Sequence, residues 1–325
     1  MNYQIKLLLL SFFVALVVAT IIIPMLRKFK IGQIEREDGP QSHLKKKGTP
    51  TMGGIITLIT LIVMSIFIFI EYREVLPEVT KSYIILVLVS VGFGVIGFID
   101  DFKKLILKDT VGLKPAYKMI GLLLISVTFV IFLLQSLNIK TDIIIPFINN
   151  SINIPVYLYI PFVIFVMLGT TNAINLTDGI DGLATSVTTI IIACLTVIGV
   201  INQCEEVVFL GSIICGANLA FLLFNMYPAK IFMGDTGSLF LGGAIASMAI
   251  YLKNPLILLI IALVPIAETV SVIIQVAYFK KTGKRIFKMA PLHHHFELSG
   301  WNENKIVTIF SVITLALCII GVYSI

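Results

Sequence analysis

Ten long runs of uncharged, mostly apolar residues constrain this chain more than any other feature of its sequence. A helix of about 18 or more such residues is long enough to cross the hydrocarbon core of a membrane. Only the ninth run contains a charged residue, Glu268. The runs predict an all-α, polytopic integral membrane protein with ten transmembrane helices in a single domain, residues 1–325. They lie at 7–26, 51–70, 82–99, 119–139, 156–177, 182–204, 207–229, 236–252, 254–279 and 306–325.

The composition excludes several other classes of protein. Charged residues make up 13% of the chain, whereas a soluble protein carries about 25%. The apolar runs are continuous and do not alternate, which argues against a transmembrane β-barrel. The net charge of +6 does not indicate nucleic-acid binding, because it is divided between the two sides of a membrane. The four cysteines have neither a disulfide-framework nor a metal-ligand spacing.

Lysine and arginine residues indicate the orientation, because cytoplasmic loops carry an excess of them. With the N-terminus outside, nineteen of the 24 lysine and arginine residues lie on the cytoplasmic side. We therefore expect both termini outside and five cytoplasmic loops that form the active site. All four histidines and the aspartate-rich motifs also fall on that side. On the other side, 140–155 is expected to form a short β-hairpin.

The segment IGFIDDFKK at 96–104 places Asp100 and Asp101 where an apolar run ends. Adjacent carboxylates at a membrane edge are costly unless a cation lies nearby. The pair could belong to a site for a divalent metal and phosphate. It could equally be a solvated helix end neutralised by Lys103 and Lys104.

The segment NAINLTDGIDGLA at 172–184 joins two apolar runs. Asp178 and Asp181 would share a face if the backbone were helical, and Gly179 would let a ligand approach the backbone. An Asx turn could explain the same composition without a ligand. Because the segment has two aspartates and no cation of its own, we favour a functional role.

The segment FMGDTGS at 232–238 precedes another run. The free N–H groups at such a helix start suit phosphate, although Thr236 or Ser238 could simply cap the helix. Asp235 would repel phosphate unless a metal lay between them. The segment therefore predicts a metal-bridged phosphate site.

Three consecutive histidines, His293, His294 and His295, lie in a cytoplasmic loop. On a helix they would point about 100° apart, so they could not all bind one ion. We expect a tight loop near phosphate and not a zinc site. Glu268, beside Pro265, is expected to mark a broken helix that lines a polar cleft. The basic run at 45–47 could serve only to anchor the chain at anionic lipid.

Carboxylates, histidines, basic residues and a helix start at one membrane face together indicate metal-assisted phosphoryl transfer. The set of motifs resembles the phospho-N-acetylmuramoyl-pentapeptide-transferase family of the polyprenyl-phosphate N-acetylhexosamine-1-phosphate transferase superfamily. Sister transferases partly share four of the motifs, whereas APLHHHFE at 290–297 is typical of the muramoyl-pentapeptide branch. The motifs are KKKGTPTMGG at 45–54, IGFIDDFKK at 96–104, NAINLTDGIDGLA at 172–184, FMGDTGSLFLGG at 232–243 and KMAPLHHHFELSGW at 288–301.

The resemblance implies a reaction in the bacterial cytoplasmic membrane. Undecaprenyl phosphate would attack the β-phosphate of UDP-N-acetylmuramoyl-pentapeptide on the cytoplasmic face, with Mg²⁺ as cofactor. UMP would leave, and the lipid-linked product, lipid I, would enter peptidoglycan biosynthesis. The resemblance also implies a homodimer.

The resemblance implies roles for particular residues as well. Asp100 is expected to orient other groups, because the lipid phosphate has a second pKa of about 6 and hardly needs a base. The implied catalytic residues are Asp100, Asp101, Asp235, His293, His294 and His295. The implied substrate-binding residues are Lys47, Thr49, Lys104, Lys118, Asn175, Asp178, Gly179, Asp181 and Phe232. The implied metal ligands are Asp235, Asp101 and Asn175.

Two alternatives remain. A sister transferase would use UDP-N-acetylglucosamine as donor, although the histidine-rich loop argues against it. A secondary transporter could use a broken ninth helix and Glu268 near the membrane midplane. Transporters keep their polar sites near the midplane, whereas the polar motifs of this chain crowd one face.

Overall fold

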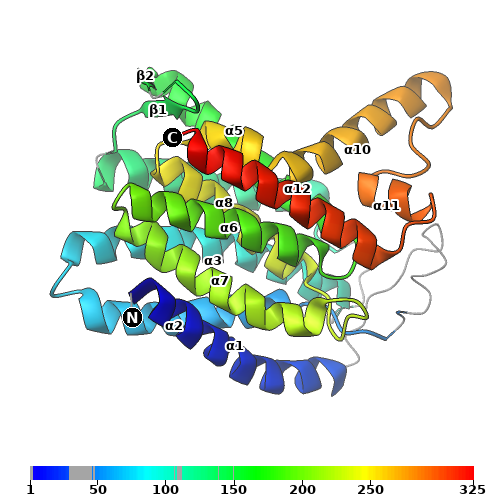
Figure 1. The fold of residues 1–325 in the computed structure, drawn as a ribbon, viewed down its shortest axis with the longest axis horizontal. Coiled ribbons are helices and arrows are strands. Elements are labelled where there is room, and N and C mark those ends of the chain that lie inside the picture. The colour runs from blue at the N-terminus through cyan, green and yellow to red at the C-terminus, as the bar shows by residue number, and fades with distance from the viewer. Residues whose placement is uncertain are drawn as a thin grey trace.

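The computed structural model of the chain is a bundle of long helices (Figure 1). It describes residues 3–28, 46, 48–105, 107, 112–137, 139–148 and 150–325. Lys47, one of the expected substrate-binding residues, lies outside the described residues.

Helices account for almost all of the regular structure. A π-helical turn, η2 (Phe132–Ser136), extends α4, and a 3-10 turn, η3 (Pro255–Ile257), precedes α9. The α-helices are α1 (Tyr3–Lys28), α2 (Gly54–Tyr72), α3 (Pro77–Leu105), α4 (Pro115–Ile131), α5 (Val156–Thr177), α6 (Leu183–Ile201), α7 (Glu205–Asn225), α8 (Gly234–Tyr251), α9 (Leu258–Ile261), α10 (Leu263–Thr282), α11 (Leu292–Glu297) and α12 (Glu303–Tyr323).

Within the described part of the chain, nine helices are long and apolar enough to cross a membrane. They are α1 to α3, α4 with η2, α5 to α7, α10 and α12. The structure therefore confirms a helical, multi-pass membrane protein. The run at 236–252 forms α8, which is not among the nine.

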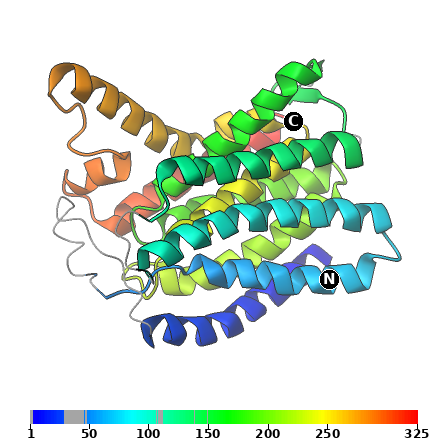
Figure 2. The ribbon, with the colours of Figure 1, turned by 180° about the vertical axis from the view of Figure 1, so that it is seen from behind.

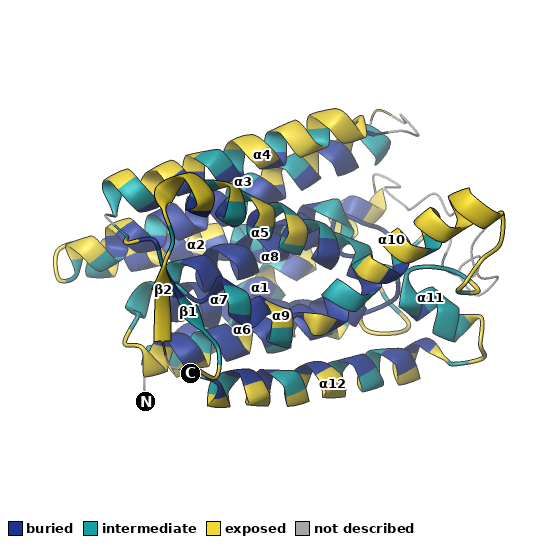
Figure 3. Cartoon of the chain, turned by 90° about the horizontal axis from the view of Figure 1, so that it is seen from above, coloured by how far each residue is buried: buried dark blue, intermediate teal, exposed yellow. Residues whose placement is uncertain are grey.

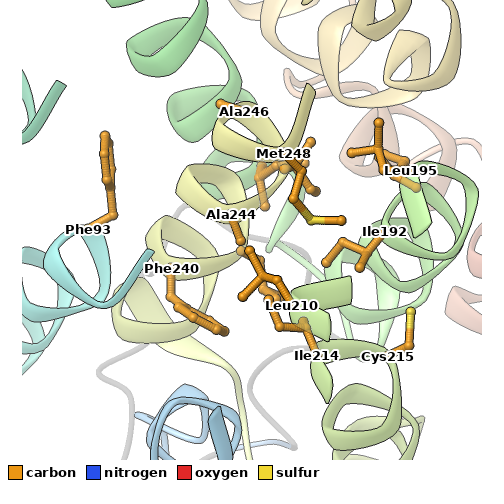
Figure 4. Packing of buried hydrophobic residues seen from close by; sticks show 14 of the residues in the cluster. Phe93, Ile192, Leu195, Leu210, Ile214, Cys215, Phe240, Ala244, Ala246 and Met248 are labelled. Atoms are coloured by element: carbon orange, nitrogen blue, oxygen red, sulfur yellow. The ribbon is translucent and has the colours of Figure 1, made fainter. Parts of the chain in front are cut away.

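Helix α8 lies at the centre of the bundle, where it packs mainly on α3 and α5 (Figure 3). Every residue from Thr236 to Ile250 is buried. Figure 4 shows Phe240 and Met248 of α8 on the side of Leu210 of α7, with Phe93 of α3 on the opposite side of α8. Because protein and not lipid surrounds α8, this helix can carry more glycine and serine than the outer helices.

Two glycines allow the start of α8 to approach its neighbours closely. A Cβ atom on Gly97 of α3 would lie 2.1 Å from the Asp235 carbonyl oxygen, and one on Gly54 of α2 would lie 2.2 Å from Gly237 Cα. No larger residue fits at either contact, as is common where membrane helices pack through small residues. These contacts bring α2, α3 and α8 together beside Asp235.

The expected span at 254–279 is broken, as its proline predicted. The chain leaves helical geometry at Ala262, between α9 and α10. Pro265 has no N–H, and its ring would clash with the carbonyl of Ile261 in a continuous helix. Beyond the break, α10 leaves the bundle at an angle (Figures 1 and 2). Glu268 does not line a cleft, since its side chain is fully buried.

A β-hairpin and both ends of the chain lie at one end of the bundle, which we call the hairpin end (Figure 1). The predicted hairpin is confirmed as β1 (Asp142–Ile145) paired antiparallel with β2 (Asn150–Asn153). It is tied to the C-terminus by a hydrogen bond from Phe147 N–H to the Ser324 carbonyl oxygen. Helix α11 lies at the opposite end, which we call the site end.

Candidate functional site

Polar side chains from four helices converge at the site end. Asp235 is the second residue of α8, and its Oδ2 accepts hydrogen bonds from Lys104 of α3 and Lys118 of α4, each 3.0 Å long. Its Oδ1 accepts a 2.8 Å hydrogen bond from Asn175 Nδ2 of α5. Asn175 also donates to Ser238 Oγ. The structure thus brings together Asp235, Lys104 and Asn175, which come from three separate motifs, with Lys118, and we call this group the Asp235 centre.

Asp100 lies beside this centre and has both carboxylate oxygens engaged. Its Oδ2 accepts from Lys104 at 2.7 Å, and its Oδ1 accepts from the Leu113 N–H at 2.7 Å. Lys118 Nζ lies 3.6 Å from Oδ2. The Asp100 side chain is 2% exposed. Lys104 therefore bridges Asp100 and Asp235.

Asp101 points toward the start of α8 and caps it. Its carboxylate accepts from the Asp235 N–H at 3.2 Å, from the Thr236 N–H at 2.8 Å and from Thr236 Oγ1 at 2.6 Å. Met233, the residue that precedes the helix, supplies no side-chain cap. The expectation that these N–H groups bind phosphate is wrong, because they donate to Asp101. A buried carboxylate is stable only when hydrogen-bond donors surround it. Thr236 contributes by donating to Asp101.

Asp178 follows the last residue of α5 and faces the same centre. Partial burial and the carboxylates of Asp235 and Asp101 raise the pKa of Asp178 to about 8, although a hydrogen bond from the Gly234 N–H lowers it. The ionised form of Asp178 is therefore disfavoured both by burial and by the neighbouring carboxylates. A further cation would relieve their repulsion.

Asp181 does not share a face with Asp178, because the helix ends at Thr177 and the backbone turns. Its carboxylate pairs with Lys46 at 2.7 Å and accepts from the Ala229 N–H at 2.9 Å. Lys46 also pairs with Glu303 at 2.6 Å, and Glu303 accepts from the Asp181 N–H. Burial lowers the pKa of Lys46, but the hydrogen bonds and charges of these two carboxylates outweigh it and raise the pKa overall.

This ion-paired group joins four segments that are distant in sequence. Glu303 could not be assigned to the site from the sequence, because an acidic residue at a helix start is a common pattern with no link to the other motifs. Lys46 lies in the basic run at 45–47, and anchoring at anionic lipid explained that run without any role in the site.

The three histidines lie on the short helix α11, so the expectation of a tight loop is wrong. His293 is buried and contacts Glu268 of α10. His294 Nδ1 lies 2.7 Å from Glu297 Oε2, and His295 Nδ1 accepts from the Lys288 N–H. The three rings have different partners, as their spacing predicted. Within the described residues, no group of three or more His, Cys, Asp or Glu side chains could hold a metal.

Thr49 and Phe232 lie on two segments that pair beside the start of α8. The Phe232 N–H donates to the Pro50 carbonyl oxygen, and the Gly53 N–H donates to the Phe232 carbonyl oxygen. Gly179 is pressed against the ring of His293. All of the expected site residues that the structure describes therefore lie at the site end.

A helical membrane bundle with this polar centre at one end matches a known class of transferase. The family model described as "Glycosyl transferase family 4" matches residues 83–253. Three similar proteins are phospho-N-acetylmuramoyl-pentapeptide-transferases of bacteria. That of Clostridium botulinum (strain Eklund 17B / Type B) is 51% identical over 97% of this chain and 94% of its own. Those of Acetivibrio thermocellus and Clostridium novyi (strain NT) are 48% and 47% identical, over 97% and 100% of this chain and 93% and 97% of their own.

The chain therefore belongs to glycosyl transferase family 4 and, within it, to the phospho-N-acetylmuramoyl-pentapeptide-transferase family. The alignment with the Clostridium novyi protein covers 100% of this chain, so it extends beyond the residues that the family model matches. The resemblance that the motifs indicated is confirmed.

Proposed function

We propose that this chain transfers phospho-N-acetylmuramoyl-pentapeptide from the UDP-linked donor to undecaprenyl phosphate, which releases UMP and forms lipid I. The observation that carries the proposal is the centre at Asp235, where carboxylates and lysines from separate helices meet at the end of a membrane bundle. The names of the relatives support the same reaction.

The main barrier to this reaction is crowding of negative charge between two phosphates. A lipid phosphate is largely a dianion at neutral pH, since its second pKa is about 6, so it is already a nucleophile. Stabilisation of the transition state must come from cations held near the reacting phosphorus. Lys104 and Lys118, which lie within 3.0 Å of Asp235, are positioned to supply part of it.

Magnesium is the cofactor that we propose. Mg²⁺ in phosphate-transferring enzymes is bound through one or two carboxylates together with waters and substrate phosphates. Asp235, Asp101 and Asn175 offer carboxylate and amide oxygens of that kind, and the raised pKa of Asp178 fits a centre that accommodates one more cation. When bound, the metal would neutralise charge on the phosphates.

Asp100 is proposed to orient Lys104 and not to act as a base. Both of its oxygens accept hydrogen bonds, one from Lys104 and one from a backbone N–H. A carboxylate so engaged is well placed to hold a cation in position.

We propose that α8 is a tenth membrane-spanning helix, that both termini lie outside and that the site faces the cytoplasm. The positive-inside distribution supports this orientation. Both ends of the chain lie at the hairpin end (Figures 1 and 2), which supports an even number of crossings. The charged nucleotide cannot enter hydrocarbon and the prenyl chain cannot leave it, so the substrates can meet only at the interface. The bacterial cytoplasmic membrane provides that interface.

A homodimer is the assembly that we propose, on the basis of the family resemblance alone. Native mass spectrometry of the detergent-solubilised protein would test it, and a monomer at all concentrations would exclude it. The transporter alternative is disfavoured, because the relatives are named as transferases and the polar residues gather at one end of the bundle.

Purified protein in detergent, given both substrates and Mg²⁺, is expected to release UMP from the muramoyl-pentapeptide donor. Asp235→Asn should remove nearly all turnover while the protein still folds, because it removes charge at the centre. UMP release from UDP-N-acetylglucosamine alone would favour a sister transferase. If Asp235→Asn keeps its magnesium response and more than about a tenth of the rate, less than ~1.4 kcal/mol was lost and Asp235 is not the metal ligand.

Asp100→Asn is expected to lower the rate by an amount that stays constant above about pH 7, because the lipid phosphate is already ionised there. An obligatory base would instead be worth about 10²–10⁴-fold. If Asp100 were such a base, the rate lost in Asp100→Asn would be recovered as the pH rises and the lipid phosphate ionises without help. A pH–rate profile of both proteins between about pH 6 and 9 distinguishes the two. A deficit that closes steadily across this range would contradict the orienting role.

The proposed orientation predicts the accessibility of two exposed positions, Gln135 near the hairpin end and Ser299 near the site end. In a background without the native cysteines, Gln135→Cys should react with a membrane-impermeant thiol reagent in intact cells. Ser299→Cys should react only after the cells are permeabilised. Modification of position 299 in intact cells would show that the orientation is inverted.

A further inference from the structure

Glu268 is a fully buried carboxylate that the proposed reaction does not use. It lies on α10, three residues after Pro265, and its side chain is 0% exposed. Burying a carboxylate is costly unless hydrogen-bond donors surround it. The partners of Glu268 should therefore indicate what it does.

The partner of Glu268 is His293, at the start of α11. The His293 N–H points at both carboxylate oxygens, at 3.2 and 3.4 Å, and His293 Nδ1 lies 3.3 Å from Oε1. Pro291, the residue before α11, provides no side-chain cap. Glu268 thus reaches across from another helix to satisfy an N–H in the first turn of α11, where a negative charge is also favourable.

The other side of the His293 ring presses on Gly179. A Cβ atom on Gly179 would lie 2.1 Å from His293 Nε2 and 2.7 Å from Cε1. In the described part of the chain, neither ring nitrogen of His293 makes a hydrogen bond, and Nδ1 has a 3.3 Å contact with Glu268 Oε1. The ring therefore acts by contact and fixes how closely α11 can approach the turn that carries Asp178.

We propose that Glu268 is a positioning residue: it holds His293 against Gly179 and so sets the Asp178 turn beside the Asp235 centre. This inference rests on the proposed function, and it assigns the nucleotide of the donor to the turn at Asp178 and Gly179, two residues that the family resemblance implies to bind substrate. Glu268 touches no substrate, and its effect passes through His293 and Gly179.

Binding of UMP to the purified full-length protein, measured by calorimetry, tests the inference without turnover. Glu268→Ala leaves a buried N–H without an acceptor and should weaken UMP binding about 10-fold or more. Glu268→Gln keeps an acceptor oxygen of the same reach, so its UMP affinity should stay within about threefold of wild type. Glu268→Asp keeps the negative charge on a shorter side chain, so its UMP affinity should lie between those of Glu268→Ala and Glu268→Gln. This variant replaces Glu268→Ala in the test if Glu268→Ala does not fold.

Thr269→Val is the matched control. Thr269 is adjacent on α10, and its hydroxyl donates only to the Pro265 carbonyl oxygen of the same helix. This variant should bind UMP as the wild type does. In turnover, the KM for the nucleotide donor should rise in Glu268→Ala, while the KM for undecaprenyl phosphate should not change.

A double-mutant cycle with His293→Ala tests the path of the effect. If Glu268 acts through His293, the double variant should bind UMP no more weakly than the weaker single variant. Additive losses, equal UMP affinity in Glu268→Ala and wild type, or a Glu268→Gln variant as impaired as Glu268→Ala would each overturn the positioning role. Absence of UMP binding by the wild type would instead overturn the proposed function together with the inference.

Discussion

The Asp101 carboxylate at the end of α3 holds the first turn of α8, and the geometry of the polar centre depends on this contact. Three donors converge on it, two of them backbone N–H groups of Asp235 and Thr236. The approach is possible because Gly97, one turn earlier on α3, has no Cβ to strike the Asp235 carbonyl oxygen. With its backbone fixed in this way, Asp235 can meet two lysines and an asparagine from three other helices.

Charge balance explains why these groups meet at the end of the bundle and not at its middle. Several carboxylates so close together repel one another, and the repulsion is tolerable only with cations and water nearby. Lys104 and Lys118 supply part of the compensation. Burial and the charges of Asp235 and Asp101 together still raise the pKa of Asp178, which supports the proposal that a divalent cation binds there.

The membrane-spanning helices could be predicted from the sequence, because hydrocarbon imposes length and apolarity on each of them. The break in the helix near Pro265 could also be predicted, because proline disrupts a helix through its own ring and its missing N–H. The partners of the polar residues could not. Asp101 caps a helix more than a hundred residues away, and Glu303 pairs with Lys46 across most of the chain. No local pattern encodes such contacts, which exist only once the helices have packed.

The claim that the Asp101 cap holds α8 is tested most directly by a double-mutant cycle between Asp101→Leu and Thr236→Val. The free energy of unfolding is measured in detergent for the wild type, both single variants and the double variant. A hydrogen bond to a buried charge is worth about 1.5–3 kcal/mol. The loss of unfolding free energy in the double variant should therefore be smaller, by about 1 kcal/mol or more, than the sum of the losses in the two single variants. Losses that add within about 0.5 kcal/mol would show that the two side chains act independently and would contradict the account.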